Sequence, residues 1–398
     1  MRLESWLWIG LFCAATAITA SAQTFQTVAS FSFFANGAYP EYMALVQGSD
    51  GNFYGTTTYG GDEGYGTAFE VTTGGELSEL YTFCEFPSCT DGGEPYGGLV
   101  QAADSTLYGT TYQDGANGTG TVFELTTGGT ETVLYSFCSQ TNCADGDDPF
   151  APLVQATDKN FYGTTLDGGT KGYGTVFAIT SAGALTTLHS FRYSDGASPV
   201  AGLIQAKNGN FYGTALYGGA HGAGTVFEIS AAGKLKTLHS FGAAGDGANP
   251  YAALVQAADG TFYGTTYSGG SHGQGTVFAI TAAGKLTTIY SFCSEKKCSD
   301  GAAPYAGVIQ ATDGNFYGTT SQGGTSNRGT VFAITAARKV TSLHSFCLKK
   351  NCIDGADPSG GLIQSTNGIF YGTTTEGGAN QDGTVFSLSV GLGPAYRK

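Results

Sequence analysis

Short apolar and aromatic runs recur along this chain, separated by turns rich in glycine, aspartate and asparagine. One representative stretch has such runs at residues 253–256, 261–265, 275–280 and 286–292. Each run has the length of a β-strand, and both alternating faces are apolar or aromatic, as in Phe262-Tyr263 and Val277-Phe278. That pattern is typical of strands whose sheet is covered on both faces. It predicts four short strands packed between other layers of protein.

This four-run unit occurs seven times, at intervals of 50 to 54 residues. A tyrosine in an aromatic-Tyr-Gly-Thr motif marks each second run, except that leucine precedes the tyrosine once. These tyrosines are Tyr54, Tyr108, Tyr162, Tyr212, Tyr263, Tyr317 and Tyr371. Each has a glutamine seven residues before it and a phenylalanine fifteen residues after it. Such regular self-similarity predicts a repeat architecture, either a closed propeller or an open solenoid.

The two ends of the chain favour the closed ring. The seventh unit begins at Gly361 and ends near Ser389 with only three runs. A fourth-run signature, apolar-Tyr/His-Ser-Phe in the other units, has its counterpart near the N-terminus as Val28-Ala29-Ser30-Phe31. A strand from each terminus in one sheet closes a ring and removes the open edges. We therefore predict an all-β, seven-bladed propeller of four-stranded blades, with the last blade closed by an N-terminal strand.

The turns between the first and second runs carry a hairpin signal. Asp259-Gly260 is repeated as Asn208-Gly209, Asp313-Gly314 and Asn367-Gly368. Such pairs favour a type I′ turn, in which both central residues have positive φ. We therefore expect tight two-residue hairpins at these positions.

Residues 1–22 have the order of a secretory signal peptide. Arg2 precedes an apolar run from Trp6 to Ala17, and Ala20-Ser21-Ala22 provides a cleavage site before Gln23. The apolar run is too short to span a membrane. We expect a signal peptide at 1–22, the propeller at 23–390 and a tail at 391–398. The mature chain is then secreted or extracellular, with the periplasm as the alternative, and it has no transmembrane segment.

Eight cysteines of the mature chain form four pairs with identical spacing. The pairs are Cys84/Cys89, Cys138/Cys143, Cys293/Cys298 and Cys347/Cys352. In an exported chain this pattern predicts four local disulfides. A metal site is the competing interpretation, but no histidine or second thiol pair lies nearby at ligand spacing. We expect no metal ion and no cofactor.

The formal net charge of −14 is distributed unevenly. Residues 23–170 contain 19 acidic residues against the single basic Lys159, whereas from Lys171 onward 11 acidic residues face 15 basic ones. A basic stripe for nucleic acid is absent from the sequence, which argues against that partner. The acidic half is explained by solubility, or else by cation binding or oriented docking.

The repeat resembles that of the Gloeobacter–Verrucomicrobia, or GloVer, tandem-repeat family. The resemblance lies in Asp259-Gly260-Thr261-Phe262-Tyr263-Gly264-Thr265-Thr266, followed by Gly269-Gly270 and Gly275-Thr276-Val277-Phe278, and it recurs seven times. It implies an exported bacterial protein of undetermined activity, often with a C-terminal surface-sorting segment. No such segment follows Ser389 in this sequence, and the family provides no catalytic residues to transfer.

Candidate binding residues lie where the loops are long. In a propeller, the loops between the second and third strands share one face with the connections between blades, and both are long here. The connections carry Asp-Gly-x-x-Pro, whose aspartate we expect to cap its own turn. We expect the repeated glutamine to bond backbone or neighbouring blades, and His189, His239 and His344 to be structural. Variable side chains on a rigid scaffold favour recognition, and we select Tyr217, His221, Tyr267 and His272 as ligand contacts, the tyrosines by stacking on sugar rings.

The sequence contains no nucleophile elbow, metal motif, phosphate loop or close acid/base pair. Nearly equivalent positions in seven copies favour multivalent binding. Our first hypothesis is a monomeric extracellular binding or adhesion protein that recognises glycans through the long-loop face. A glycan lyase or hydrolase that uses residues differing between blades is the second. A structural cell-surface protein without a ligand is the third.

Overall fold

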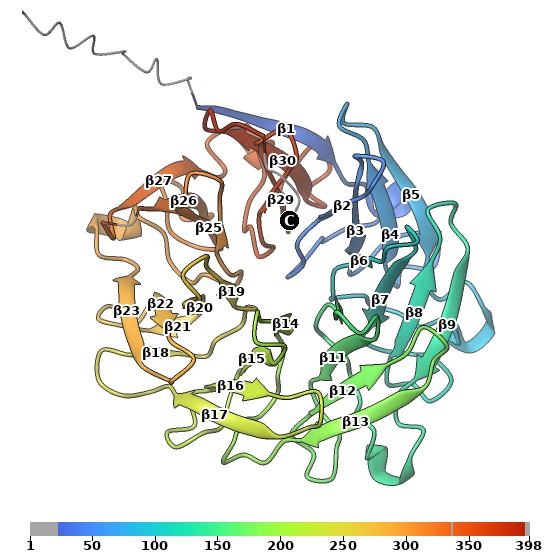
Figure 1. Cartoon of the computed structure of the whole chain (residues 1–398). Coiled ribbons are helices and arrows are strands. Elements are labelled where there is room, and N and C mark those ends of the chain that lie inside the picture. The colour runs from blue at the N-terminus through green and yellow to red at the C-terminus, as the bar shows by residue number, and fades with distance from the viewer. Residues whose placement is uncertain (1–22, 336, 395–398) are drawn as a thin grey trace, which may run out of the picture.

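In the computed structural model, which describes residues 23–335 and 337–394, the chain forms a ring of seven antiparallel four-stranded blades (Figure 1). Blade 1 runs outward from the axis as β2 (Val46–Gln47), β3 (Phe53–Thr57), β4 (Thr67–Val71) and β5 (Leu77–Thr82). The predicted seven-bladed propeller is therefore confirmed. The signal peptide expected at 1–22 lies outside the described residues.

The following five blades repeat this order. Blades 2 and 3 are β6 (Val100–Gln101), β7 (Leu107–Thr111), β8 (Thr121–Leu125), β9 (Glu131–Ser136), and β10 (Val154–Gln155), β11 (Phe161–Thr165), β12 (Thr175–Ile179), β13 (Leu185–Ser190). Blades 4 and 5 are β14 (Ile204–Gln205), β15 (Phe211–Ala215), β16 (Thr225–Ile229), β17 (Leu235–Ser240), and β19 (Val255–Gln256), β20 (Phe262–Thr266), β22 (Thr276–Ile280), β23 (Leu286–Ser291). Blade 6 is β24 (Ile309–Gln310), β25 (Phe316–Thr320), β26 (Thr330–Ile334) and β27 (Val340–Ser345). A small extra ladder joins β18 (Gly247–Ala248) to β21 (Ser268–Gly269).

Blade 7 contains both ends of the described chain. It consists of β28 (Ile363–Gln364), β29 (Phe370–Thr374), β30 (Thr384–Ser389) and β1 (Thr24–Ser30). β1 pairs antiparallel with β30, from Thr24 opposite Ser389 to Ser30 opposite Thr384, as the adjacent blue and red strands show (Figure 1). The predicted closure is confirmed, and the closing strand begins earlier than the expected residues 28–31.

The aromatic-Tyr pair of each motif joins neighbouring blades, because successive side chains of a strand point to opposite faces. Tyr108 of blade 2 stacks on Phe161 of blade 3 with a centroid distance of 4.1 Å, and Tyr162 of blade 3 stacks on Phe211 of blade 4 at 4.0 Å. Phe53 meets Tyr371 at 4.2 Å, so the same contact closes the ring between blades 7 and 1. The alternating apolar and aromatic side chains, which predicted a sheet covered on both faces, thus form the core between neighbouring blades.

The repeated glutamines and aspartates have the structural roles expected of them. Gln101 accepts a hydrogen bond from the Ser49 amide of blade 1, at 2.8 Å, while its own amide group donates within blade 2. The Asp145 carboxylate accepts bonds from the amides of Ser139 and Gln140 and from the Tyr135 hydroxyl. His239 takes the place of that tyrosine in blade 4 and bonds Asp246 at 2.7 Å. These groups hold the connections against the outer strands.

The type I′ prediction for the first hairpins is wrong. In the turn after β19 only Gly260 has a positive φ, of 86°, and the turn is closed by hydrogen bonds from Ala257 N to Thr261 O and from Gly260 N to Ala257 O. This is a longer loop with one left-handed residue, the position that glycine occupies most readily. Ser105 and Lys159 accept the same conformation in blades 2 and 3, with φ of 70° and 73°.

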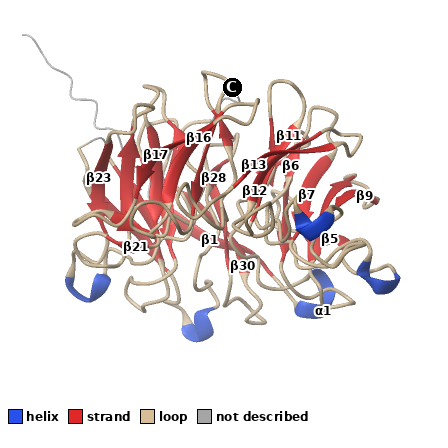
Figure 2. Cartoon of the chain, turned by 90° about the horizontal axis from the view of Figure 1, so that it is seen from below, coloured by secondary structure: helices blue, strands red, loops and turns tan. Residues whose placement is uncertain are grey.

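All four predicted disulfides are present: Cys84–Cys89, Cys138–Cys143, Cys293–Cys298 and Cys347–Cys352. Each includes one short 3₁₀ turn, η1 (Pro87–Cys89), η2 (Thr141–Cys143), η3 (Lys296–Cys298) or η4 (Lys350–Cys352). These turns and α1 (Phe33–Asn36) lie on the long-loop face, at the bottom of the side view (Figure 2). Within the described residues, no helix has the length and apolar character needed to cross a membrane.

Candidate functional site on the long-loop face

Five aromatic rings from five parts of the chain meet near the axis on the long-loop face. Tyr96, Phe150, Tyr251 and Tyr305 each follow a connection proline, in blades 2, 3, 5 and 6. Tyr42 contacts all four, with centroid distances of 6.1, 5.5, 6.0 and 5.3 Å. We call these five rings the axial aromatic cluster. Its members occupy one repeat position, five residues before the repeated glutamine, in five different blades.

Blade 1 has one extra residue in the segment that holds Tyr42, although Tyr42, like the other four rings, stands five residues before its repeated glutamine. Gln47 lies seven residues after Pro40, whereas the corresponding proline and glutamine of the other six units are six residues apart. In this lengthened segment Tyr42 has a left-handed backbone, with φ of 53°, and its amide donates to Ser359 Oγ at 3.2 Å. The insertion breaks the sevenfold repetition and was readable from the spacing, although our sequence analysis did not use it.

A polar cleft of about 480 Å³ lies beside Tyr42, between blades 6 and 7 and the connection into blade 1. Tyr42 and Tyr305 provide its aromatic wall. Polar side chains form the remaining wall: Glu41, Ser321, Gln322, Asn327, Arg328, Asp357, Ser359 and Thr375. The cleft therefore offers aromatic faces and a dense set of hydrogen-bonding groups in one place.

Two charged features give the cleft its electrostatic character. Arg328 Nη1 donates to Asp357 Oδ2 at 2.6 Å and to Glu376 Oε2 at 3.0 Å, which fixes the guanidinium at the rim. Burial, followed by the negative charge of Glu376, raises the pKa of Glu41 to about 7. A carboxyl that titrates near neutrality can donate or accept a proton at physiological pH.

An apolar cavity of about 270 Å³ adjoins the same rings along the axis. Its walls include Tyr42, Phe150, Tyr251 and Tyr305, together with small apolar side chains such as Val200. The axial aromatic cluster thus borders a polar cleft and an apolar cavity.

The four residues selected from the sequence divide between two places. Tyr267 contacts Tyr305 and Tyr251, with centroid distances of 4.5 and 6.1 Å, and so extends the axial aromatic cluster. Tyr217 is 47% exposed and pairs in a β-bridge with Ala197 of the preceding connection. In blade 5 the equivalent pairing, with Ala248, is made by Ser268 and not by Tyr267. The two tyrosines are therefore one position out of register and are not equivalent.

His221 and His272 are equivalent and lie at the outer rim. His272 borders an open hollow of about 420 Å³ with Gly245 and with Tyr290 of the outer strand β23. At the same repeat position Asn117 donates to the Phe137 carbonyl at 2.8 Å, at the end of outer strand β9. The histidines thus share an exposed rim position, while Tyr267 lies at the axis.

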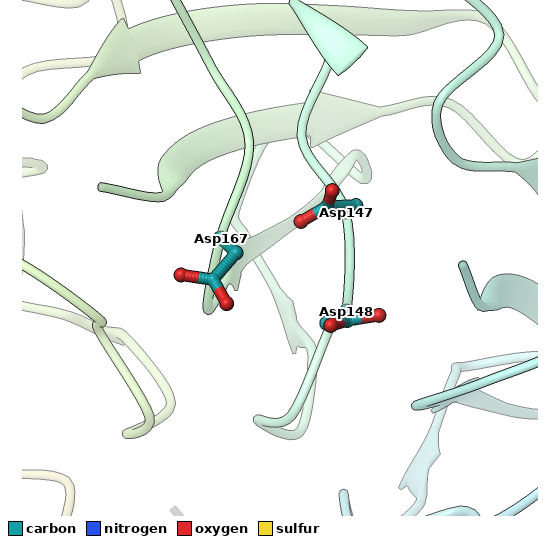
Figure 3. Close-up of side chains that lie close together, drawn as sticks. All are labelled: Asp147, Asp148 and Asp167. Carbon is teal, nitrogen blue, oxygen red and sulfur yellow. The ribbon is translucent and has the colours of Figure 1, made fainter. Parts of the chain in front are cut away.

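Three carboxylates gather on the same face between blades 2 and 3. The ligand oxygens of Asp147, Asp148 and Asp167 lie within 4.8 Å of one another (Figure 3), and this is the one metal-compatible group found in the described residues. Burial, followed by the charges of Asp147 and Asp167, raises the pKa of Asp148 to about 7. Sequence analysis missed this group, because Asp167 is distant along the chain and belongs to another loop.

A counterpart within the same chain shows what is different about these carboxylates. Asp148 and Asp167 correspond in the repeat to Asp357 and Glu376, which share the guanidinium of Arg328. Thr119 stands at the position of that arginine in blade 2. The carboxylates between blades 2 and 3 therefore lack the cation that neutralises their counterparts.

The sequence profile of the Gloeobacter/Verrucomicrobia repeat matches residues 14–207, 139–300 and 295–394. The chain belongs to this repeat family. The resemblance recognised from the motif is thereby confirmed. No curated protein matches the chain.

Solved propellers resemble the chain in fold. A streptogramin B lyase is 12% identical, with a TM-score of 0.63 over 92% of this chain and 98% of its own. The virginiamycin B lyase of Staphylococcus aureus is 10% identical, with a TM-score of 0.60 over 92% and 99%. The extracellular domain of a putative hybrid two-component system from B. thetaiotaomicron is 12% identical, with a TM-score of 0.60 over 92% of this chain and 41% of that one. At these identities the likeness concerns the fold alone.

The four disulfides bear on where the protein resides. Structural disulfides persist in oxidising compartments and are rare in the cytosol. Four local bridges in one chain therefore indicate a location outside the cytoplasm.

Proposed function

We propose that this protein is an extracellular binding protein that recognises a glycan in the polar cleft beside Tyr42. The observation that carries the proposal is the meeting of the Tyr42 and Tyr305 rings with a wall of hydrogen-bonding side chains in one cleft of about 480 Å³. A sugar ring has apolar C–H faces and a rim of hydroxyls. It therefore needs aromatic faces and many donors and acceptors together.

The polar wall suits hydroxyl groups. Asn327 and Gln322 each carry a donor and an acceptor on one amide, and Ser359 and Thr375 add hydroxyls. Arg328 is already oriented by two carboxylates, so less side-chain entropy is lost when it binds a ligand. This pre-ordering favours recognition of a polar ligand.

Tyr267 belongs to the proposed surface through its contact with Tyr305. A longer glycan that runs outward over blades 4 and 5 would reach Tyr217, and then His221 and His272 at the rim. The proposed cleft therefore forms the centre of the site, and the four residues selected from the sequence form its extension.

A glycan lyase or hydrolase is the second candidate, and Glu41 is the observation that favours it. Its pKa of about 7 suits a general acid or base, and it shares the cleft with Arg328. In this case Glu41→Gln would abolish polysaccharide degradation and leave binding in place. A purely structural surface protein would neither bind a glycan nor degrade one.

The test is a glycan array combined with a polysaccharide-degradation assay on the disulfide-bonded protein. For the best glycan, Tyr305→Ala and Gln322→Ala should each weaken binding by about tenfold or more, because each removes a wall of the cleft. Lys234→Ala, an exposed change on the opposite face, is the matched control. Unchanged affinity in both cleft variants would contradict the proposal.

A further inference from the structure

A second hollow, of about 310 Å³, opens on the opposite face between blades 5 and 6. Its floor is apolar and includes Val277, Phe316 and Ile334, while Lys285 and Arg338 border it from two hairpins. We call it the hairpin-face hollow. It is separate from the proposed glycan cleft and shares no lining residue with it.

The hollow departs from the repeat, because it exposes a core side chain whose counterparts in the other blades are fully covered. Phe316 is 8% exposed, whereas the residues at the same position in the other six blades are at most 1% exposed. Those residues are Phe53, Leu107, Phe161, Phe211, Phe262 and Phe370. Tyr263, which stacks on Phe316 at 4.1 Å, is likewise only partly buried. The opening therefore reaches the packing layer between two blades.

Two short side chains of blade 5 account for the space. In blade 4 the equivalent positions hold Asn210 and Glu228, whose side chains hydrogen-bond at 2.7 Å across this region. Blade 5 has Thr261 and Ala279 instead. Every other blade keeps at least one longer side chain at this pair of positions. Blade 5 alone leaves the region empty of long side chains.

Arg338, in the turn between β26 and β27, keeps blade 6 from closing over the space that the short side chains of blade 5 leave. The turns between third and fourth strands place a glycine with positive φ at this position in blades 1 to 5. These glycines are Gly75, Gly129, Gly183, Gly233 and Gly284. A Cβ on any of them would lie 2.4–2.8 Å from a carbonyl oxygen in the outer strand of the preceding blade. Arg338 has a Cβ, so its turn cannot approach the corresponding strand of blade 5 as closely.

Arg338 also adopts an unfavourable backbone. Its φ of 62° lies in the left-handed region, where a residue with a Cβ is strained. Strain of this kind is often kept where the side chain has a function. Here the strained residue contributes its guanidinium to the border of an apolar hollow.

We propose that the hairpin-face hollow binds a small organic anion with an apolar body and one carboxylate. The apolar body would cover Val277, Phe316 and Ile334, and the carboxylate would meet Arg338 and Lys285. An arginine fork matches a carboxylate in geometry as well as charge. The Asp259 carboxylate of blade 5 accepts a hydrogen bond, of 2.9 Å, from the amide of Thr261, which lines the hollow.

The experiment titrates the full disulfide-bonded protein with decanoate, decanol and acetate by calorimetry. Decanoate should bind most tightly, because decanol lacks the charge and acetate lacks the apolar body. Arg338→Gly restores the glycine of the other blades, and Ala279→Glu restores the acid of blades 1, 2 and 4. Each should weaken decanoate binding by about tenfold or more. Lys339→Gln, at the adjacent exposed residue outside the hollow, should bind as the parent does.

Thermal melting separates loss of the site from loss of the fold. Arg338→Gly should melt at the parent temperature or above it, because it relieves the left-handed arginine while it removes binding. The proposal is overturned if decanol binds as well as decanoate, or if Arg338→Gly keeps the parent's affinity. Loss of decanoate binding would leave the glycan assay of the other face unchanged, so the two proposals fail independently.

Discussion

Phe25 of β1 stacks on His344 of β27, with ring centroids 3.6 Å apart and planes 4° from parallel. These residues come from opposite ends of the chain and from different blades. β1 therefore both completes the sheet of blade 7 and packs against blade 6. Phe25 also contacts Phe346 and Phe386, so the closing strand reaches the core between these blades.

Removing residues 23–34 should destabilise the protein strongly. Blade 7 would lose its outer strand, and the edge of β30 would be left open. Burial of Phe25 and Phe31 would be lost as well, at a cost of about 3 kcal/mol or more for a core phenylalanine. Thermal and urea unfolding measure the effect. Cooperative melting of the truncated protein at the parent temperature would show that β1 does not close the ring.

Replacement of Glu131 by leucine should stabilise the protein, most clearly at alkaline pH. Glu131 begins β9 at a position where the other outer strands of blades 1 to 6 have leucine or valine. Burial, followed by the charges of Asp91 and Glu124, raises its pKa to about 8, and Oε1 has no hydrogen-bond partner. A leucine there would gain on the order of 1–2 kcal/mol from apolar burial.

The pH dependence follows from the sign of that shift. Because the folded pKa of about 8 exceeds the ordinary value of 4.5, the contribution of Glu131 to stability is full below pH 4.5 and is lost as the pH rises to 8. The gain from Glu131→Leu should therefore grow from pH 4.5 to 8 in urea unfolding. Glu76→Gln, an exposed change, is the control. A gain that does not vary with pH would show that Glu131 ionises as freely in the folded chain as in the unfolded one.

Peptide mapping of non-reduced protein should find the four short-range cysteine pairs and no others. Each closes a six-residue ring, so its loss through a double Cys→Ser change should cost about 2 kcal/mol in the chain-entropy account. Chemical unfolding of the Cys138→Ser/Cys143→Ser variant measures this cost. Scrambled pairs or free thiols in the native protein would contradict the local bridges.

The repetition allowed much of the fold to be predicted, because it locates each residue within its blade. The closing strand, the capping aspartates and the bridging glutamines all follow from positions that recur. The type I′ turns were predicted wrongly because Asp-Gly and Asn-Gly also suit a longer loop with one left-handed residue. Here the backbone selects that loop, with positive φ at Gly260 alone.

The candidate site was harder to predict. Its five rings occupy one repeated position, five residues before each glutamine, but blades 4 and 7 have Val200 and Ser359 there. Tyr42 meets rings from four other blades, three of which do not adjoin its own, and the period alone does not say which side chains reach the axis. Tyr217 and Tyr267 looked alike in the sequence, since both follow the second strand. Their pairing with the preceding connection separates them by one register position.

Deletion of Tyr42 tests the central claim most directly. It restores the six-residue spacing of the other units and removes the aromatic side chain at the centre of the proposed glycan site. The variant should keep cooperative melting, because the other blades fold with that spacing, and its affinity for the glycan found on the array should fall by about tenfold or more. Full glycan affinity in a folded protein without Tyr42 would contradict the claim that this cleft is the binding site.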